Sequence, residues 1–326
     1  MNIRRLVRIL AIITSLATYL ILLLGTLVTT TDSGLGCGNS WPFCHGQIIP
    51  GKITVAGVIE YSHRVMSSTD GLLVVALTVA TWLLYRRDFR ARLFSAMSLF
   101  FVLLQGALGA LTVIYEGTFT KNWFLSVHFG FSLIAFSSLI LLTIRLFQLH
   151  REQQHPEEEK APPIRSLQFP VWGLAIYTYL VVYTGALVEH SGAILGCGYQ
   201  YPTCGSTFFP DFTSLAGIQV LHRYAAGLLW FLVLGFLIVV LRSYRARRDI
   251  VQGALWTFVF ITLQAISGME NVLSGGQMLA ALLHATIISV FFSALCYLCM
   301  QVGWPWQRNR LKQDIKSEQP ELNTVP

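Results

Sequence analysis

Residues 9–30 read ILAIITSLATYLILLLGTLVTT, a run of 22 residues without a charged side chain. A transmembrane helix needs about 20 apolar residues to cross the hydrocarbon core of a bilayer. This run is long enough for one crossing, and it is followed by Thr-Asp with no small-residue cleavage site of the kind that ends a signal peptide. The sequence therefore predicts that residues 9–30 are retained as the first membrane helix.

Further apolar runs of similar length follow along the chain of 326 residues. The composition agrees with many crossings, because 54% of the residues are hydrophobic and only 12% are charged, against about a quarter charged in a soluble domain. We therefore predict an all-α polytopic membrane protein with eight transmembrane helices. The predicted helices are 9–30, 64–85, 93–115, 122–144, 168–188, 222–241, 250–269 and 278–301.

Basic residues are distributed unevenly between the two sides of these helices. Of the 23 lysines and arginines, 19 lie on the side of the termini, and the other four are Lys52, Arg64, Lys121 and Arg223. By the positive-inside rule, both termini are predicted to be cytoplasmic. This topology also explains the net charge of +7, since the basic residues stand in short clusters between apolar runs. Nucleic-acid binding is excluded on that ground, and the lipid bilayer is the expected environment.

The two halves of the chain resemble each other. Gly25, Leu35-Gly-Cys-Gly38, Pro42 and Cys44 recur 160 positions later as Gly185, Leu195-Gly-Cys-Gly198, Pro202 and Cys204. Ile59-Glu-Tyr-Ser-His-Arg64 matches Ile218-Gln-Val-Leu-His-Arg223, and Gln105 with Gly109 matches Gln264 with Gly268, 159 positions later. Because each half has an even number of crossings, both have the same orientation in the membrane. We predict two parallel-repeat four-helix bundles lying side by side.

The bundles are expected at residues 1–150 and 166–307. The polar segment 151–165 between them contains a run of three glutamates and a pair of adjacent prolines, a composition typical of a linker. Residues 308–326 are charged and are predicted to form a cytoplasmic tail. The chain is therefore expected to have two helical units, a cytoplasmic linker and a cytoplasmic tail.

Four of the six cysteines lie in two predicted external loops. Cys37 and Cys44 lie in the first external loop, and Cys197 and Cys204 lie at the matching positions of the third. Both pairs face an oxidising compartment, so we expect the disulfides Cys37–Cys44 and Cys197–Cys204. A redox role for the first pair stays open. A four-cysteine zinc site is disfavoured, because the six residues between the cysteines of each pair make a long spacing for such a site.

Four histidines lie at corresponding places towards the outer ends of predicted helices: His63, His128, His222 and His284. Ionisable groups at membrane depth are costly and therefore indicate function. A lone histidine of this kind would more often be a polar core residue, but two pairs in register favour a shared role. Two imidazoles from facing helices suit the axial positions of a haem iron. Zinc or copper would need further donors, and none recurs in both halves.

The neighbours of these histidines carry the remaining chemistry. Arg64 and Arg223 each directly follow a candidate ligand, where a guanidinium group can pair with the carboxylates of a haem. Glu60 precedes His63 by one helical turn, and its counterpart in the second half is Gln219. A carboxyl group can give or take a proton, whereas an amide cannot at neutral pH. The first half is therefore expected to do chemistry and the second to pass electrons. An i, i+4 pair between Glu60 and Arg64 is the alternative.

The Gly-Cys-Gly…Trp-Pro-x-Cys-His pattern around Cys37 to His45, the Glu60-Tyr-Ser-His63-Arg segment and their diverged copies resemble the bacterial haem A synthases. The resemblance extends over all eight crossings, and the two cysteine pairs place the chain with the four-cysteine type. It implies an oxidoreductase of the bacterial cell membrane. The implied reaction oxidises the C8 methyl group of haem O to the formyl group of haem A by successive hydroxylations.

The resemblance also implies a role for each candidate residue. His63 and His128 would hold haem O in the N-terminal bundle, with Glu60 taking part in catalysis. His222 and His284 would hold a haem b (iron protoporphyrin IX) as electron carrier. Haem O is thus the expected substrate. An electron donor or acceptor that the sequence does not identify is also expected, and a haem O synthase (protoheme farnesyltransferase) is a candidate partner.

Two other functions fit part of the pattern. A di-haem electron-transfer cytochrome would use the same four histidines but has no need of Glu60. A transporter of haem or of a small solute would fit the parallel repeats. Extracted pigments distinguish these functions, since only a haem A synthase predicts that cells without the protein accumulate haem O and lack haem A.

Overall fold

The computed structural model describes residues 3–48, 50–51, 54–115, 119–156, 164–205 and 208–305, apart from the side chains of 119–122. The helices are α1 (Ile3–Thr30), α2 (Val55–Leu84), α3 (Phe89–Ile114), α4 (Phe119–Gln154), α5 (Arg165–His190), the short 3-10 helix η1 (Ala193–Leu195), α6 (Leu215–Ser243), α7 (Arg248–Leu273) and α8 (Met278–Val302). Among the described residues, eight helices are long and apolar enough to cross a membrane. The predicted all-α membrane fold with eight transmembrane helices is confirmed.

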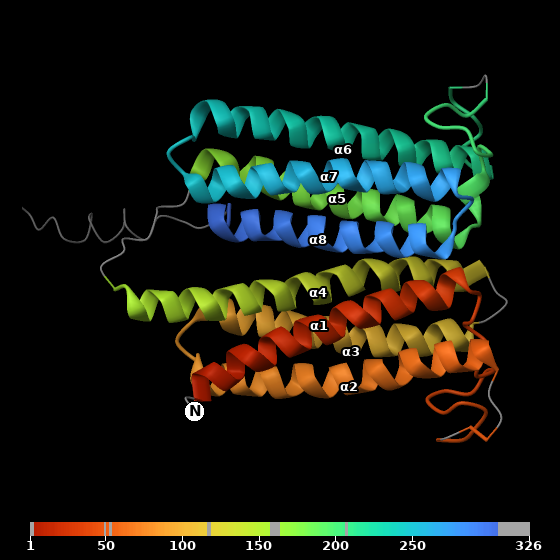
Figure 1. Ribbon diagram of the computed structural model, residues 1–326, viewed down its shortest axis with the longest axis horizontal. Helices are drawn as coiled ribbons and strands as arrows, with labels where there is room; N and C mark the ends of the chain where they lie inside the picture. The colour runs from red at the N-terminus through yellow and green to blue at the C-terminus, as the bar shows by residue number, and fades with distance from the viewer. Residues whose placement is uncertain are drawn as a thin grey trace, which may run out of the picture.

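Helices α1–α4 form one group and α5–α8 form a second group beside it (Figure 1). The connections α1–α2 and α5–α6 lie at one end of the molecule, which we call the loop end. The N-terminus lies at the other end, which we call the basic end. The assignment of the units to residues 1–150 and 166–307 stays a prediction. The predicted tail 308–326, residues 157–163 of the linker, Lys52 and the side chain of Lys121 lie outside the described residues.

Each group has a core of large buried side chains. They include Leu77, Leu139, Leu142 and Leu146 in the first group and Val233, Ile250, Phe291 and Leu295 in the second. Two hydrogen bonds, each 3.0 Å long, join the groups, between the hydroxyls of Tyr19 and Thr286 and between those of Ser137 and Ser293. Many large apolar side chains on the helices are exposed, as expected of surfaces that face lipid; Leu72 is 73% exposed.

Helices α2 and α6 begin nine and seven residues before their predicted starts at 64 and 222. Each begins with a hydroxyl cap, because Thr54 Oγ1 and Ser214 Oγ accept the N–H groups of Gly57 and Gly217, each at 3.1 Å. Hydropathy misses these first turns because they include polar residues and pack against the disulfide loops rather than lipid. The candidate histidines of these helices therefore lie two turns inside them, not at their first residues.

Candidate functional site

Each candidate histidine packs against a glycine of the preceding helix. The couples are Gly25 on α1 with His63 on α2, Gly109 on α3 with His128 on α4, Gly185 on α5 with His222 on α6, and Gly268 on α7 with His284 on α8. A methyl group added at these glycines would lie 3.5, 3.7, 2.9 and 3.1 Å, respectively, from Cε1 of the histidine. The same couple thus occurs four times, once in each pair of consecutive helices, and it is tightest at Gly185.

The structure brings the predicted histidine pairs together. His63 and His128 lie close enough to interact electrostatically, and so do His222 and His284. Among the described residues, no group of three or more His, Cys, Asp or Glu side chains could hold a metal ion. A zinc site uses three or four protein donors, whereas a haem iron uses one or two axial ones. The donors present therefore fit a haem in each half.

The imidazoles of the first half have an unsatisfied ring nitrogen. Nδ1 of His63 and Nδ1 of His128 are buried and have no hydrogen-bond partner within the described ranges. A buried polar atom without a partner is unusual and commonly indicates a missing ligand or water. Gln105 Nε2 donates to the backbone oxygen of His128 at 2.7 Å, so it contacts the helical backbone and not Nδ1 of the ring.

The imidazoles of the second half are held by hydroxyl groups. Thr184 Oγ1 lies 2.9 Å from Nδ1 of His222, and Ser267 Oγ lies 2.9 Å from Nδ1 of His284. A partner on Nδ1 fixes the ring orientation and leaves Nε2 as the nitrogen that can bind a metal. Gln264 Nε2 lies 2.9 Å from Nε2 of His284, so this amide has to move aside before that nitrogen binds iron.

Both predicted disulfides, Cys37–Cys44 and Cys197–Cys204, are present. Each disulfide loop packs closely on the first turn of the following helix. At Gly36 of the first loop, an added Cβ would lie 2.3 Å from a backbone atom of Ala56. A Cβ at Gly196, the counterpart in the second half, would also lie 2.3 Å from the backbone of the following helix. Only glycine permits this approach, so the loops cover the helix starts in both halves.

Glu60 is 4% exposed, and both of its carboxyl oxygens are engaged. Oε2 accepts the backbone N–H of Cys37 at 2.7 Å, and Oε1 pairs with the guanidinium of Arg64. Gln219 holds the second loop in the same way, since its Oε1 accepts the N–H of Cys197 at 2.9 Å. The i, i+4 pair that sequence analysis gave as the alternative is therefore present. Glu60 and Gln219 share the task of anchoring a disulfide loop.

The two arginines that follow the ligands also anchor these loops. Arg64 donates to the carbonyl oxygens of Ser40 and Phe43 at 2.7 and 2.9 Å, and Arg223 donates to those of Gln200, Pro202 and Thr203 at 2.9, 3.1 and 2.9 Å. Both were predicted as partners of haem carboxylates, and much of their donor capacity is directed to the loops instead. Arg223 Nε is buried and has no acceptor in the described part of the chain.

A second buried carboxyl group in the first half received no role from the sequence. Asp70 on α2 is 3% exposed, and its two oxygens accept from Thr18 Oγ1 at 2.9 and 3.0 Å. Its counterpart in the second half is Leu229, and that of Thr18 is Thr178, whose buried Oγ1 has no partner among the described residues. The signal was visible, since Asp70 is the one acidic residue within the eight predicted helices.

Comparison with known proteins gives consistent matches. The model of the family described as cytochrome oxidase assembly protein (COX15-CtaA) matches residues 8–296. A heme A synthase of Bacillus mycoides is 38% identical over 298 residues, which cover 91% of this chain and 93% of that protein. A heme A synthase of Bacillus cereus is 36% identical over 317 residues, which cover 97% of this chain and 99% of that protein. The range that the family model matches contains the positions of all four candidate histidines.

Proposed function

Because the chain belongs to the cytochrome oxidase assembly protein family, and within it to the bacterial haem A synthases, we propose that it converts haem O to haem A. The proposed reaction oxidises the C8 methyl group of haem O to a formyl group by successive hydroxylations. The proposed site for this reaction is in the N-terminal unit, residues 1–150. The C-terminal unit, residues 166–307, then carries electrons through a haem b.

The observation that carries this proposal is the glycine–histidine couple repeated four times. We assign His63 and His128 to haem O and His222 and His284 to haem b. The couples support the assignment, since each glycine lets an imidazole lie against the preceding helix at matching places in both halves. When bound, haem b supplies reversible one-electron transfer.

The two histidine pairs have different surroundings, and this difference supports a haem that stays bound at one pair and a haem that binds and leaves at the other. Hydroxyl groups fix the rings of His222 and His284 at 2.9 Å, which suits a permanently bound cofactor. The rings of His63 and His128 lack such partners among the described residues, which suits a substrate that binds and leaves. This contrast supports haem O in the first half and haem b in the second.

Glu60 is the proposed proton carrier of the first site. Each oxidation of a methyl group moves protons as well as electrons, so a group that takes up or releases a proton near the substrate accelerates it. Oε1 of Glu60, paired with Arg64, is the atom we assign to that task, because Oε2 holds the Cys37 N–H. Gln219 keeps the loop contact but cannot carry a proton, which agrees with an electron-carrying role for the second half.

The environment of the enzyme follows from the same assignment. We place the chain in the bacterial cell membrane with both termini in the cytoplasm, so that the disulfide loops face the oxidising side. Arg223 has a donor to offer a haem carboxylate, since its Nε lacks an acceptor among the described residues. Haem O would come from a haem O synthase (protoheme farnesyltransferase), and a separate donor or acceptor would exchange electrons with the haem b.

A pigment analysis tests the proposal. Cells that need haem A are compared with and without the gene for this chain, and their haems are extracted and separated. The proposal predicts that the deletion accumulates haem O and lacks haem A, and that the wild-type chain restores haem A. Unchanged haem A in the deletion strain would refute the enzyme assignment.

A di-haem electron-transfer cytochrome is the second candidate. One observation favours it: both oxygens of Glu60 are used in anchoring, as the amide of Gln219 is in the other half. In that function the acid would be structural only. The same pigment analysis separates the two candidates, since a cytochrome without substrate chemistry leaves the ratio of haem O to haem A unchanged.

A further inference from the structure

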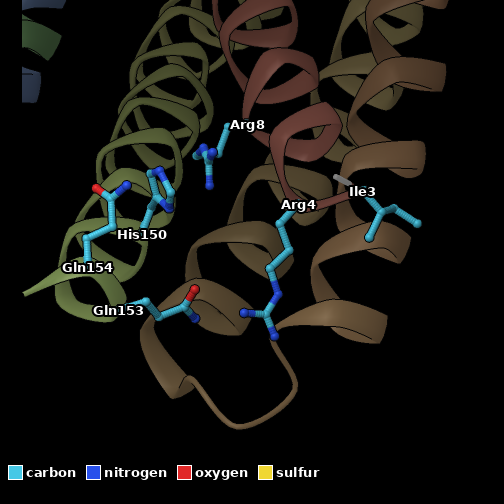
Figure 2. Close-up of a pocket in the computed structure, with 6 residues that line it drawn as sticks. All are labelled: Ile3, Arg4, Arg8, His150, Gln153 and Gln154. Carbon is cyan, nitrogen blue, oxygen red and sulfur yellow. The ribbon is translucent and has the colours of Figure 1, made fainter. Parts of the chain in front are cut away.

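A basic pocket of about 270 Å³ opens at the basic end of the molecule, between the start of α1 and the end of α4 (Figure 2). None of the described residues that line it is acidic. The residues that line the pocket are Ile3, Arg4, Arg8, His150, Gln153 and Gln154. Figure 2 shows the Arg8 guanidinium next to the His150 ring, while Arg4 extends toward the turn between α2 and α3. The lining thus offers cationic and amide donors and no carboxylate.

The acids near this pocket are used elsewhere. Asp88 and Glu152 both pair with Arg145, at 2.6 and 2.8 Å. Arg8 makes no ion pair within the described ranges, and its guanidinium lies 5.8 Å from the centre of the Phe147 ring. The positive charge of Arg8 therefore stays available to an anion that enters between α1 and α4.

The matching corner of the second half is closed. Gln168 stands 160 positions after Arg8, and its Nε2 donates to the backbone oxygen of Val302 at 2.9 Å. Trp172 donates to the oxygen of Gly303 at 3.0 Å and packs edge-on against Trp304. These contacts join the start of α5 to the end of α8, so the described side chains fill the corner that is open in the first half.

The pocket of the first half exists because α4 is longer than α8. Counting from the matched histidines His128 and His284, the last residue of α8 corresponds to Leu146 of α4. Helix α4 continues for eight further residues to Gln154. Those additional residues include His150 and both glutamines of the lining. The second half has the shorter helix and an amide in place of Arg8, so both elements of the pocket belong to the first half alone.

An apolar groove of about 470 Å³ adjoins the pocket and shares Ile3 with it. It lies between α1 and α2, and its other lining residues are Val7, Ala76, Val79, Ala80, Leu83 and Leu84. Arg4 connects the two regions, since its guanidinium lies 5.9 Å from the centre of the Tyr85 ring, just beyond the end of the groove on α2. A basic pocket beside an apolar groove is complementary to an anionic molecule with a hydrocarbon chain.

We propose that the pocket and the groove bind an anionic phospholipid of the leaflet at the basic end. The phosphate lies between Arg4, Arg8 and His150, and one acyl chain lies along the groove between α1 and α2. Guanidinium groups form strong charge-assisted hydrogen bonds to phosphate, and basic pockets between transmembrane helices select anionic head groups. The site is separate from the histidine pairs, which lie toward the loop end, and it does not depend on the function proposed for them.

Lipid counting on the full chain tests this proposal. The protein is reconstituted in nanodiscs of phosphatidylcholine with a fixed fraction of phosphatidylglycerol, and the retained lipids are counted by native mass spectrometry. The wild type is expected to retain phosphatidylglycerol in preference to phosphatidylcholine. Each arginine near an anionic surface contributes about 1 kcal/mol, or about fivefold in affinity. The double variant Arg4→Gln/Arg8→Gln is therefore expected to retain phosphatidylglycerol about 25-fold more weakly.

A matched control removes the same charge elsewhere. Arg242 and Arg245 are exposed at the same end of the molecule in the second group. The variant Arg242→Gln/Arg245→Gln is expected to retain phosphatidylglycerol like the wild type. Equal losses in both double variants, or equal retention of both lipids by the wild type, would overturn the proposal.

Two further arms identify the occupant. Millimolar inorganic phosphate is expected to leave phosphatidylglycerol bound, because it lacks the acyl chain; full displacement would assign the pocket to free phosphate. Glu157, Glu158 and Glu159, next along the chain, are a rival occupant. Changing all three to glutamine is expected to leave lipid retention unchanged, and a rise would assign the pocket to that segment.

A measurement on the unaltered protein makes the result independent of variant folding. A photoreactive phosphatidylglycerol with a diazirine in its head group is cross-linked to the wild-type chain, and labelled peptides are sequenced. The label is expected on residues 3–8 and on the end of α4 around His150. Labelling spread equally over the basic ends of both groups would contradict a specific site.

Discussion

The two helix groups have the same frame and different charges. Both have a disulfide loop pressed onto a capped helix, a Glu or Gln that holds the loop, and two glycine–histidine couples. Several positions carry a charge in the first half and a neutral residue in the second. They include Glu60 and Gln219, Asp70 and Leu229, and Arg8 and Gln168. The shared features build the two sites, and the unshared charges indicate what only the first half does.

The largest predicted effect concerns the glycine–histidine couples, which both halves share. Gly185→Ala places a methyl group 2.9 Å from Cε1 of His222, whereas Gly109→Ala places one 3.7 Å from Cε1 of His128, an ordinary contact. Overpacking costs about 1–3 kcal/mol, or roughly fivefold to 150-fold in affinity. Haem titration of the Soret band should show that weakening at the second site for Gly185→Ala and no change for Gly109→Ala. Equal effects would contradict the role of the couple.

The next prediction tests whether the two disulfides stabilise the protein equally. Each closes a loop from one cysteine to another seven positions later, so the chain-entropy model assigns about 2.5 kcal/mol to each. Replacing both cysteines of either pair by serine should lower the thermal stability in detergent by a similar amount. If the Cys37–Cys44 variant also loses haem A formation at full protein level while the Cys197–Cys204 variant keeps it, the first pair has a role beyond stability.

A smaller effect concerns the ion pair of Asp88 with Arg145 at the basic end of the first group, where the second group has a different pair, Arg247 with Asp249. Burial by itself raises the pKa of Asp88, but hydrogen bonds from Arg145 and from the Ala91 N–H hold this pKa below its ordinary value. That contribution to stability is complete above the unfolded-state pKa of about 3.9 and is lost as the pH falls through the lower folded-state pKa. Asp88→Asn should therefore cost about 1.5 kcal/mol at neutral pH.

The difference between wild type and Asp88→Asn should shrink below about pH 4 and stay constant between pH 6 and 8. Unfolding midpoints measured across this range check the sign. A difference that grows on acidification would show that another group is responsible. Gln301 stands where the first half has Arg145, so the variant Gln301→Ala should show no such dependence on acid.

The smallest effect tests whether Asp70 is needed for folding. Asp70→Leu copies the second half, where Leu229 and Thr178 stand at the matching positions and Thr178 Oγ1 has no hydrogen-bond partner among the described residues. Thr18 keeps an acceptor, since its hydroxyl also donates to the backbone oxygen of Thr14 at 3.0 Å. The stability should therefore change by less than about 1 kcal/mol. A loss of more than about 3 kcal/mol in the free energy of unfolding would show that the first half does not tolerate the leucine–threonine pair of the second half.

Sequence pattern was sufficient for the helices but not for their ends. Each helix contains a long apolar run, and hydropathy detects such runs directly. It placed the start of α2 nine residues too late because the first turns include Glu60, Ser62 and His63, are capped by Thr54 and are covered by the disulfide loop. Which face of a helix a loop covers depends on tertiary contacts, and those have no periodic signal in the sequence.

The candidate site could be predicted in its members but not in their contacts. The repeat marked the histidines, Glu60 and the matching arginines. The repeat also matched Gly109 with Gly268 and Gly25 with Gly185. It could not show that these glycines lie against imidazole rings, because such contacts depend on which helices are neighbours. The role of Arg64 at a haem carboxylate stays a prediction, but the sequence did not predict its bonds to Ser40 and Phe43, which arise because the disulfide loop folds back over α2.

The central claim is that the acid of the first half carries protons, while its amide counterpart only holds a loop. The matched variants Glu60→Gln and Gln219→Glu test it, with haem O and haem A quantified in membranes that contain equal amounts of each protein. We expect Glu60→Gln to keep its helices, disulfides and haem b, because Gln219 already anchors a loop as an amide. Loss of general acid–base catalysis should lower haem A formation by about a hundredfold or more, whereas Gln219→Glu should form haem A normally. Unimpaired haem A formation by Glu60→Gln would contradict the account.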